Sequence, residues 1–131
     1  MLSAPRIGIS REAQAWRYRD RGFPGELGKP RPAVILQHDD LNEILTTILA
    51  CPMTTHVIET PWLRPIIVPT IDNGLQELSQ IMSEKISPLR REVIRQQIGR
   101  LDEDDLNRLE VALLHIIGLT HKMQLQAQTS E

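Results

Sequence analysis

The chain has 131 residues, a net charge of −2 and 40% apolar residues, which is typical of one soluble globular domain. This charge excludes a polycation that binds nucleic acid indiscriminately, and aromatic residues at 3% are too few for a base-stacking platform. One cysteine excludes an intrachain disulfide, and no apolar run approaches the ~20 residues that span a bilayer. Because the N-terminus also lacks the apolar core of a signal peptide, we expect a cytoplasmic protein without membrane contact.

Residues 1–24 show no sustained apolar period, and charged residues crowd the part from Arg11 to Arg21. We expect this segment to be an arm, either mobile or a short frayed helix. The next loop is rich in glycine and proline and delivers Arg31, which Pro32 biases toward an extended backbone. Arginine presents a planar fork of donors that suits a phosphate group. Arg31 is therefore a candidate phosphate-binding residue at the start of a strand.

The middle of the chain predicts a series of short strands. Each is an apolar or threonine-containing run bounded by proline or by polar turn residues. We expect Pro52 to end the second strand, and Asp72-Asn73-Gly74 is a strong turn signal because asparagine and glycine accept a positive φ at low cost. The predicted strands cover residues 33–36, 44–51, 56–59, 64–68 and 79–86.

The last third of the chain changes to a helical period. Asp102 is a good N-cap, and the acidic residues that follow it are stabilising at the positive, N-terminal end of a helix dipole. We expect a helix over 102–118 that ends near Gly118 and covers one face of the sheet. The predicted domain spans residues 25–121, with a disordered polar tail at 122–131. The fold class is α+β: a small antiparallel, SH3-like barrel with a C-terminal helix.

Five segments occur in the order in which they occur in one protein family. They are Gly28–Leu36 with its Arg-Pro pair, Cys51–Thr55, Asn73–Leu75, Ser79–Ile86 and Ile98–Leu101. The capped helix follows them, and the chain over residues 25–119 resembles the MazF/PemK-type toxins.

This resemblance implies a metal-independent endoribonuclease that cuts single-stranded RNA and inhibits translation. Members are homodimers, and the tail of a cognate antitoxin occupies their RNA groove. The resemblance places Arg31 and Thr54 at the catalytic positions, with Thr55 as the neighbouring hydroxyl. Glu84 falls near an acidic position of the late strand, where some members carry an arginine two residues earlier; here that residue is Met82.

The chain departs from the family pattern at its beginning. Members open with a strand that carries an acid, whereas residues 1–24 show no such strand. The first strand is therefore either missing or built from residues that do not favour it. Glu26 lies directly before the Arg-Pro loop and is our candidate for the acid.

Further candidates come from residue chemistry. Lys29 is a candidate RNA-binding residue together with Glu26, His56 and Glu84, and His56 could also act near neutral pH as a base. The histidines and Cys51 lack metal-ligand spacing, so we expect no metal and no cofactor. The alternative to a nuclease is a non-catalytic protein on the same fold, either a gyrase-directed toxin of the CcdB type or a degenerate toxin that only binds antitoxin. A structural remnant without a partner is the third hypothesis.

Overall fold

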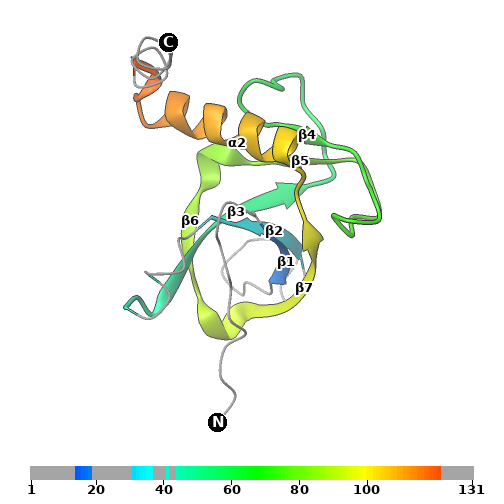
Figure 1. Cartoon of the computed structure of the whole chain (residues 1–131), viewed down its shortest axis with the longest axis vertical. Coiled ribbons are helices and arrows are strands. Elements are labelled where there is room, and N and C mark those ends of the chain that lie inside the picture. Colours follow the sequence, from blue (N-terminus) through cyan, green and yellow to red (C-terminus); the bar gives the residue numbers. More distant parts are fainter. Residues whose placement is uncertain (1–13, 19–30, 37–40, 42–43, 122–131) are drawn as a thin grey trace.

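The computed structural model describes residues 14–18, 31–36, 41 and 44–121, which form a curled sheet with one long helix beside it (Figure 1). The elements in chain order are β1 (Gln14–Tyr18), β2 (Arg31–Ile35), β3 (Thr47–Thr54), β4 (Ile66–Ile67), β5 (Ser79–Ile81), the 3-10 turn η1 (Ser83–Lys85), β6 (Ser87–Arg90), the 3-10 turn η2 (Arg91–Val93), β7 (Ile94–Arg100) and α2 (Glu103–Ile116).

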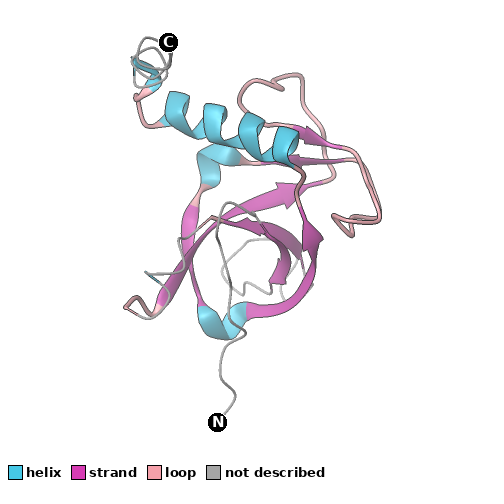
Figure 2. Ribbon diagram, in the orientation of Figure 1, coloured by secondary structure: helices cyan, strands magenta, loops and turns pink. Residues whose placement is uncertain are grey.

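All strand pairs of the sheet are antiparallel. The strand order is β4-β5-β3-β2-β1-β7, and β6 pairs with the first half of β3. The sheet therefore bends back on itself, so that β6, η2 and β7 sweep around the strands β1 and β2 (Figure 2). This architecture confirms the predicted α+β class with an antiparallel, barrel-like sheet.

The first strand is present, so of the two alternatives the one that holds is a strand built from residues that do not favour it. β1 lies between β2 and β7, with Trp16 opposite Ala33 on one side and Gln97 on the other. A five-residue strand paired on both sides receives its conformation from its neighbours, so it needs no alternating pattern of its own. The rest of residues 1–24, like the tail at 122–131, lies outside the described residues.

Pro52 does not end β3, contrary to our prediction, because it lies where β3 changes its partner strand. On one side β3 pairs with β6 up to Ala50 and with β5 from Met53 onward. The carbonyl of Pro52 accepts a hydrogen bond from the Met82 amide at 2.8 Å. The Met82 carbonyl, which a strand N–H at position 52 would bind, accepts from the Lys85 amide at 3.0 Å instead, so the proline leaves no acceptor unpaired.

The remaining strands are shorter or differently placed than predicted. Residues 56–59 form no strand, 64–68 contribute only β4, and 79–86 divide into β5 and η1. The sequence analysis did not predict β6 or β7, whose residues lack a clear alternation of apolar and polar positions. The turn at Asp72-Asn73-Gly74 is confirmed, with φ +68° at Gly74.

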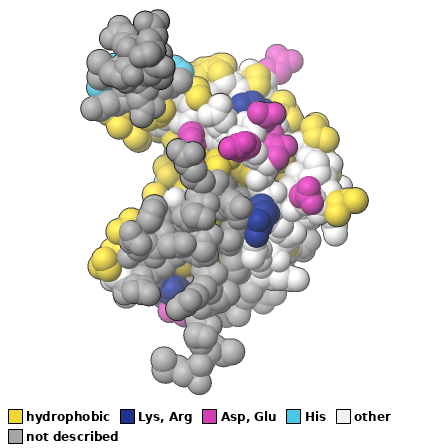
Figure 3. Space-filling view, in the orientation of Figure 1, with side chains coloured by type: hydrophobic (Ala, Val, Ile, Leu, Met, Phe, Trp, Pro, Cys, Tyr) yellow, Lys and Arg dark blue, Asp and Glu magenta, His cyan; other side chains and the backbone are white. Residues whose placement is uncertain are grey.

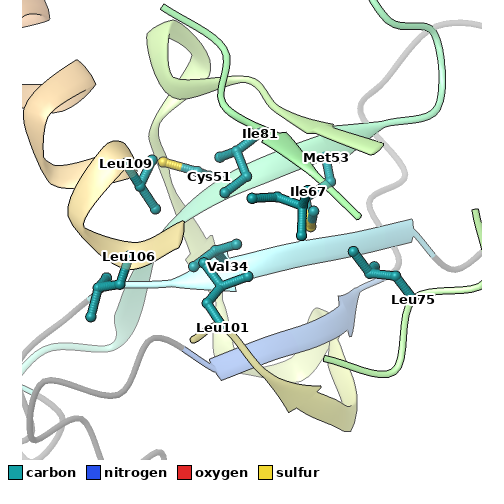
Figure 4. Packing of buried hydrophobic residues seen from close by; sticks show 9 residues of the cluster. All are labelled: Val34, Cys51, Met53, Ile67, Leu75, Ile81, Leu101, Leu106 and Leu109. Carbon is teal, nitrogen blue, oxygen red and sulfur yellow. The ribbon is translucent and has the colours of Figure 1, made fainter. Parts of the chain in front are cut away.

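The helix agrees with the prediction. Asp102 caps α2 by accepting a hydrogen bond from the Asp105 amide at 2.8 Å, and Gly118 follows the helix with φ +75°. Leu106 and Leu109 of α2 are buried against one face of the sheet (Figure 4). The cluster that they join also contains Val34, Cys51, Met53, Ile67, Leu75, Ile81 and Leu101. A second cluster consists of Ala33, Ile35, Ile48, Ala50, Leu89 and Ile94.

Candidate active site

Arg31 and Thr54 lie at the same end of two adjacent strands. Arg31 begins β2, Thr54 ends β3, and the two strands pair in antiparallel. The paired register extends as far as Ala33 opposite Pro52, so each of the two residues lies two positions beyond the last pair. Both residues are half-buried where their strands meet the adjoining loops. The two residues that the family resemblance picks out, 23 positions apart (54 − 31), thus lie at one edge of the β2–β3 pair.

The turn after β3 orients the Thr54 hydroxyl. Its Oγ1 atom accepts a hydrogen bond from the His56 amide at 3.1 Å. This bond uses one lone pair of the oxygen and leaves the hydroxyl hydrogen for a phosphate oxygen. Thr55 and His56 follow directly and are exposed, so their side chains are accessible to a ligand beside Thr54.

Glu84 binds a residue that the sequence analysis did not consider. Its Oε1 atom accepts a hydrogen bond from Nε of Arg64 at 2.6 Å, and the two side chains form an ion pair. The expected arginine position, Met82, is buried in the structure. Arg64, 20 residues earlier in the chain, thus provides the cation that pairs with this acid. The proposed contact of Glu84 with RNA stays a prediction.

Two further candidates cannot be placed. Glu26 and Lys29 lie outside the described residues, so their relation to Arg31 stays a prediction as well.

A groove of about 830 Å³ lies elsewhere on the molecule, between the turn at 70–73, β7 and the start of α2. Asp72, Asp102 and Asp105 line it together with Arg100, and Figure 3 shows acidic side chains gathered around the start of α2. None of the candidate residues in the described part of the chain lines this groove. Its acidic character makes it a poor site for an RNA backbone.

Cys51 is a core residue with an unreactive thiol. Its side chain is fully buried in the cluster beneath α2. Burial, with a smaller contribution from the negative charge of Glu84, raises the pKa of the Cys51 thiol from 9.0 to about 12. Because the thiolate is the nucleophilic form, Cys51 cannot act as a catalytic nucleophile at neutral pH.

The raised pKa of Cys51 predicts a loss of stability in alkali. The unfolded chain releases the thiol proton near pH 9, whereas the folded chain keeps it up to about pH 12. The contribution of the buried thiol to the free energy of unfolding is therefore complete below pH 9. It is lost as the pH rises toward 12, by ~1.4 kcal/mol per pH unit. Urea unfolding of the parent and of Cys51→Ala between pH 8 and pH 11 measures it. A stability difference that does not change with pH would contradict the prediction.

Two observations concern other classes of site. Among the described residues, no three His, Cys, Asp or Glu side chains come together in a group that could hold a metal ion. No helix in the described part of the chain is both long enough and apolar enough to cross a membrane.

Comparison with known proteins identifies the family. The model of the PemK-like, MazF-like toxins of type II toxin–antitoxin systems matches residues 18–117. The chain is 37% identical over 92 residues to a probable endoribonuclease MazF of Mycolicibacterium smegmatis, a match that covers 70% of this chain and 84% of the relative.

Solved structures agree with the fold. The toxin MazF-mt6 of Mycobacterium tuberculosis superposes with a TM-score of 0.67 at 21% identity, covering 81% of this chain and 97% of that one. A mycobacterial endoribonuclease in complex with its cognate antitoxin superposes with a TM-score of 0.68 at 20% identity, covering 85% and 97%. The chain belongs to the PemK-like, MazF-like toxins of type II toxin–antitoxin systems.

Proposed function

We propose that this toxin is an endoribonuclease that cuts single-stranded RNA, inhibits translation and is neutralised by a cognate antitoxin. The placement of Arg31 and Thr54 at the same end of two adjacent antiparallel strands is the observation that carries the proposal. Family membership and the relative named as a probable endoribonuclease support it. Because mRNA is its substrate, we also propose that the protein acts in the cytoplasm, as a homodimer like other members of the family.

Cleavage without a metal ion requires attack by the ribose 2′-hydroxyl on the neighbouring phosphate. A base takes the hydroxyl proton, the phosphorane carries developing negative charge, and the 5′-oxygen leaves with a proton. The Arg31 guanidinium fits the charge of the phosphorane, since its donors can bind two phosphate oxygens at once. The Thr54 hydroxyl can donate to a phosphate oxygen and keep the group in place. The exposed His56 is our candidate for the base.

The non-catalytic alternative rested on a missing first strand and on Met82 in place of an arginine. β1 is present between β2 and β7, which removes the first support. Arg64 provides a cation for Glu84, which weakens the second. The structure favours the nuclease.

The test is incubation of the purified protein with single-stranded RNA of mixed sequence in EDTA. We expect cleavage that leaves a 2′,3′-cyclic phosphate and a 5′-hydroxyl, because the 2′-oxygen becomes bonded to phosphorus as the 5′-oxygen departs. DNA of the same sequence lacks the 2′-hydroxyl and must stay intact. Binding of a co-expressed antitoxin without cleavage of any RNA would instead establish the non-catalytic alternative.

A further inference from the structure

Gln80 is a buried polar residue beside the candidate active site, and the family motifs assign it no role. Its side chain is completely buried in β5. Thr54 of β3 lies opposite Gln80 on one side, and Ile66 of β4 lies opposite it on the other. A buried amide is costly unless all its hydrogen-bonding groups find partners. The partners of Gln80 therefore indicate what it does.

All polar atoms of the Gln80 side chain bind the segment that connects β3 to β4. This segment, residues 55–65, is called the crossover loop below. Oε1 accepts from the Ile58 amide at 2.7 Å. Nε2 donates to the carbonyl oxygens of Ile58 and Arg64, each at 2.9 Å. One side chain thus holds the loop near both of its ends.

The topology explains why the crossover loop needs this attachment. β3 and β4 both run antiparallel to β5, which lies between them, so the loop must pass across β5. The hydrogen bonds within its own backbone are local and come from the amides of Thr60, Leu63 and Arg64. The ion pair of Arg64 with Glu84 and an edge-on contact of Trp62 with His115 attach its later part. Gln80 is the attachment that also reaches the earlier part, at Ile58.

The crossover loop begins at the candidate active site. Its first residues, Thr55 and His56, follow Thr54 directly and are exposed. The bond from the His56 amide to Thr54 spans only two residues and does not depend on Gln80. The position of the loop around Ile58 does depend on it.

We propose that Gln80 is a positioning residue, which holds the crossover loop as one wall of the RNA-binding site beside Thr54. The proposal rests on the proposed nuclease function. Gln80 touches no substrate, and it acts through the main chain of Ile58 and Arg64. Because Arg31 and Thr54 are held by the strand ladder, loosening the loop weakens RNA binding more than it slows the chemical step.

Three variants test the proposal. Gln80→Met keeps an unbranched side chain and removes all three bonds. Gln80→Glu keeps an acceptor for the Ile58 amide and removes both donors to the carbonyls. The matched control is Gln76→Glu, the same change at an exposed glutamine. Amide hydrogen exchange and steady-state cleavage of one RNA are measured for each.

In Gln80→Met we expect the Ile58 amide to exchange at least ~10-fold faster than in the parent, since it loses its acceptor. Gln80→Glu should keep Ile58 protected. The Met82 amide, which donates to Pro52, is the internal reference and should not change. In cleavage, Gln80→Met should raise KM ~10-fold with kcat within ~2-fold, and Gln76→Glu should match the parent.

Several results would overturn the proposal. Unchanged exchange at Ile58 in Gln80→Met would show that Gln80 does not hold the loop. A fall in kcat at constant KM would show that the loop is not a binding wall. Loss of cooperative unfolding in both Gln80 variants would assign Gln80 to the core instead. If the parent cleaves no RNA, the nuclease function fails, and the exchange measurement still decides whether Gln80 holds the loop.

Discussion

Replacing Arg31 with alanine is expected to lower kcat for RNA cleavage by ~10²–10³-fold, the loss that follows removal of one preorganised donor to a developing oxyanion. Arg31 begins β2 at the end where Thr54 closes the adjacent strand β3, and we expect the guanidinium to bind the phosphate that the threonine hydroxyl holds. Stabilisation of the phosphorane acts on the transition state, so KM should change much less. Single-turnover cleavage of a fluorescent RNA measures the chemical step.

Two matched variants separate charge from geometry at this site. Arg31→Lys keeps the positive charge but loses the planar fork, so its rate should lie between those of the parent and the alanine variant. Thr54→Val keeps the shape of the side chain and removes the hydroxyl, which should cost ~10-fold. Thermal unfolding should change little for Arg31→Lys. Cleavage by Arg31→Ala at the parent rate would remove Arg31 from the mechanism and leave the family's arginine position without a role in this chain.

Replacing Gly74 with alanine is expected to destabilise the fold by ~2–5 kcal/mol. Gly74 has φ +68°, a conformation that costs an L-residue ~1–2 kcal/mol. A Cβ atom there would also lie 1.9 Å from the carbonyl oxygen of Ile98 in β7. The turn is held against β7 by a hydrogen bond from the Arg100 amide to the Asp72 carbonyl, so the backbone cannot move away cheaply. Such overpacking adds ~1–3 kcal/mol.

Gly118 is the matched control for this prediction. It has nearly the same backbone conformation, φ +75°, but a Cβ atom there meets nothing within 4 Å. Gly118→Ala should therefore cost only the conformational part, ~1–2 kcal/mol. Urea unfolding of both variants measures the difference. Equal losses would show that the contact between the turn and β7 contributes nothing to stability.

The parts of the fold that were predicted correctly depend on local signals. The helix is specified by Asp102, which caps it, by a three- and four-residue apolar spacing, and by Gly118 after it. Each of these interactions joins residues within about one turn, so a sequence window contains all the information. The turn at Gly74 is similar, because asparagine and glycine determine its backbone locally.

The strands were predicted less well because their partners are remote in sequence. β1 pairs with β7, about eighty residues away, and neither strand alternates clearly. Pro52 was expected to end a strand, and only the change of partner from β6 to β5 shows why it does not. β5 was expected to continue to residue 86 and instead gives way to η1. Pairing of this kind cannot be inferred from one short segment.

The sequence by itself determined the helix with its cap, the antiparallel α+β class and, through the order of its motifs, the protein family. These features depend on contacts between near neighbours or on residue types that stand in the chain itself. Only the tertiary structure decided that β1 completes the sheet, that Arg64 pairs with Glu84 and that Gln80 holds the crossover loop. The pairs Arg64–Glu84 and Gln80–Ile58 lie 20 and 22 residues apart. Such contacts form only after the sheet has brought distant segments together. The entropy lost on closing each loop must be offset by the packing of the whole domain.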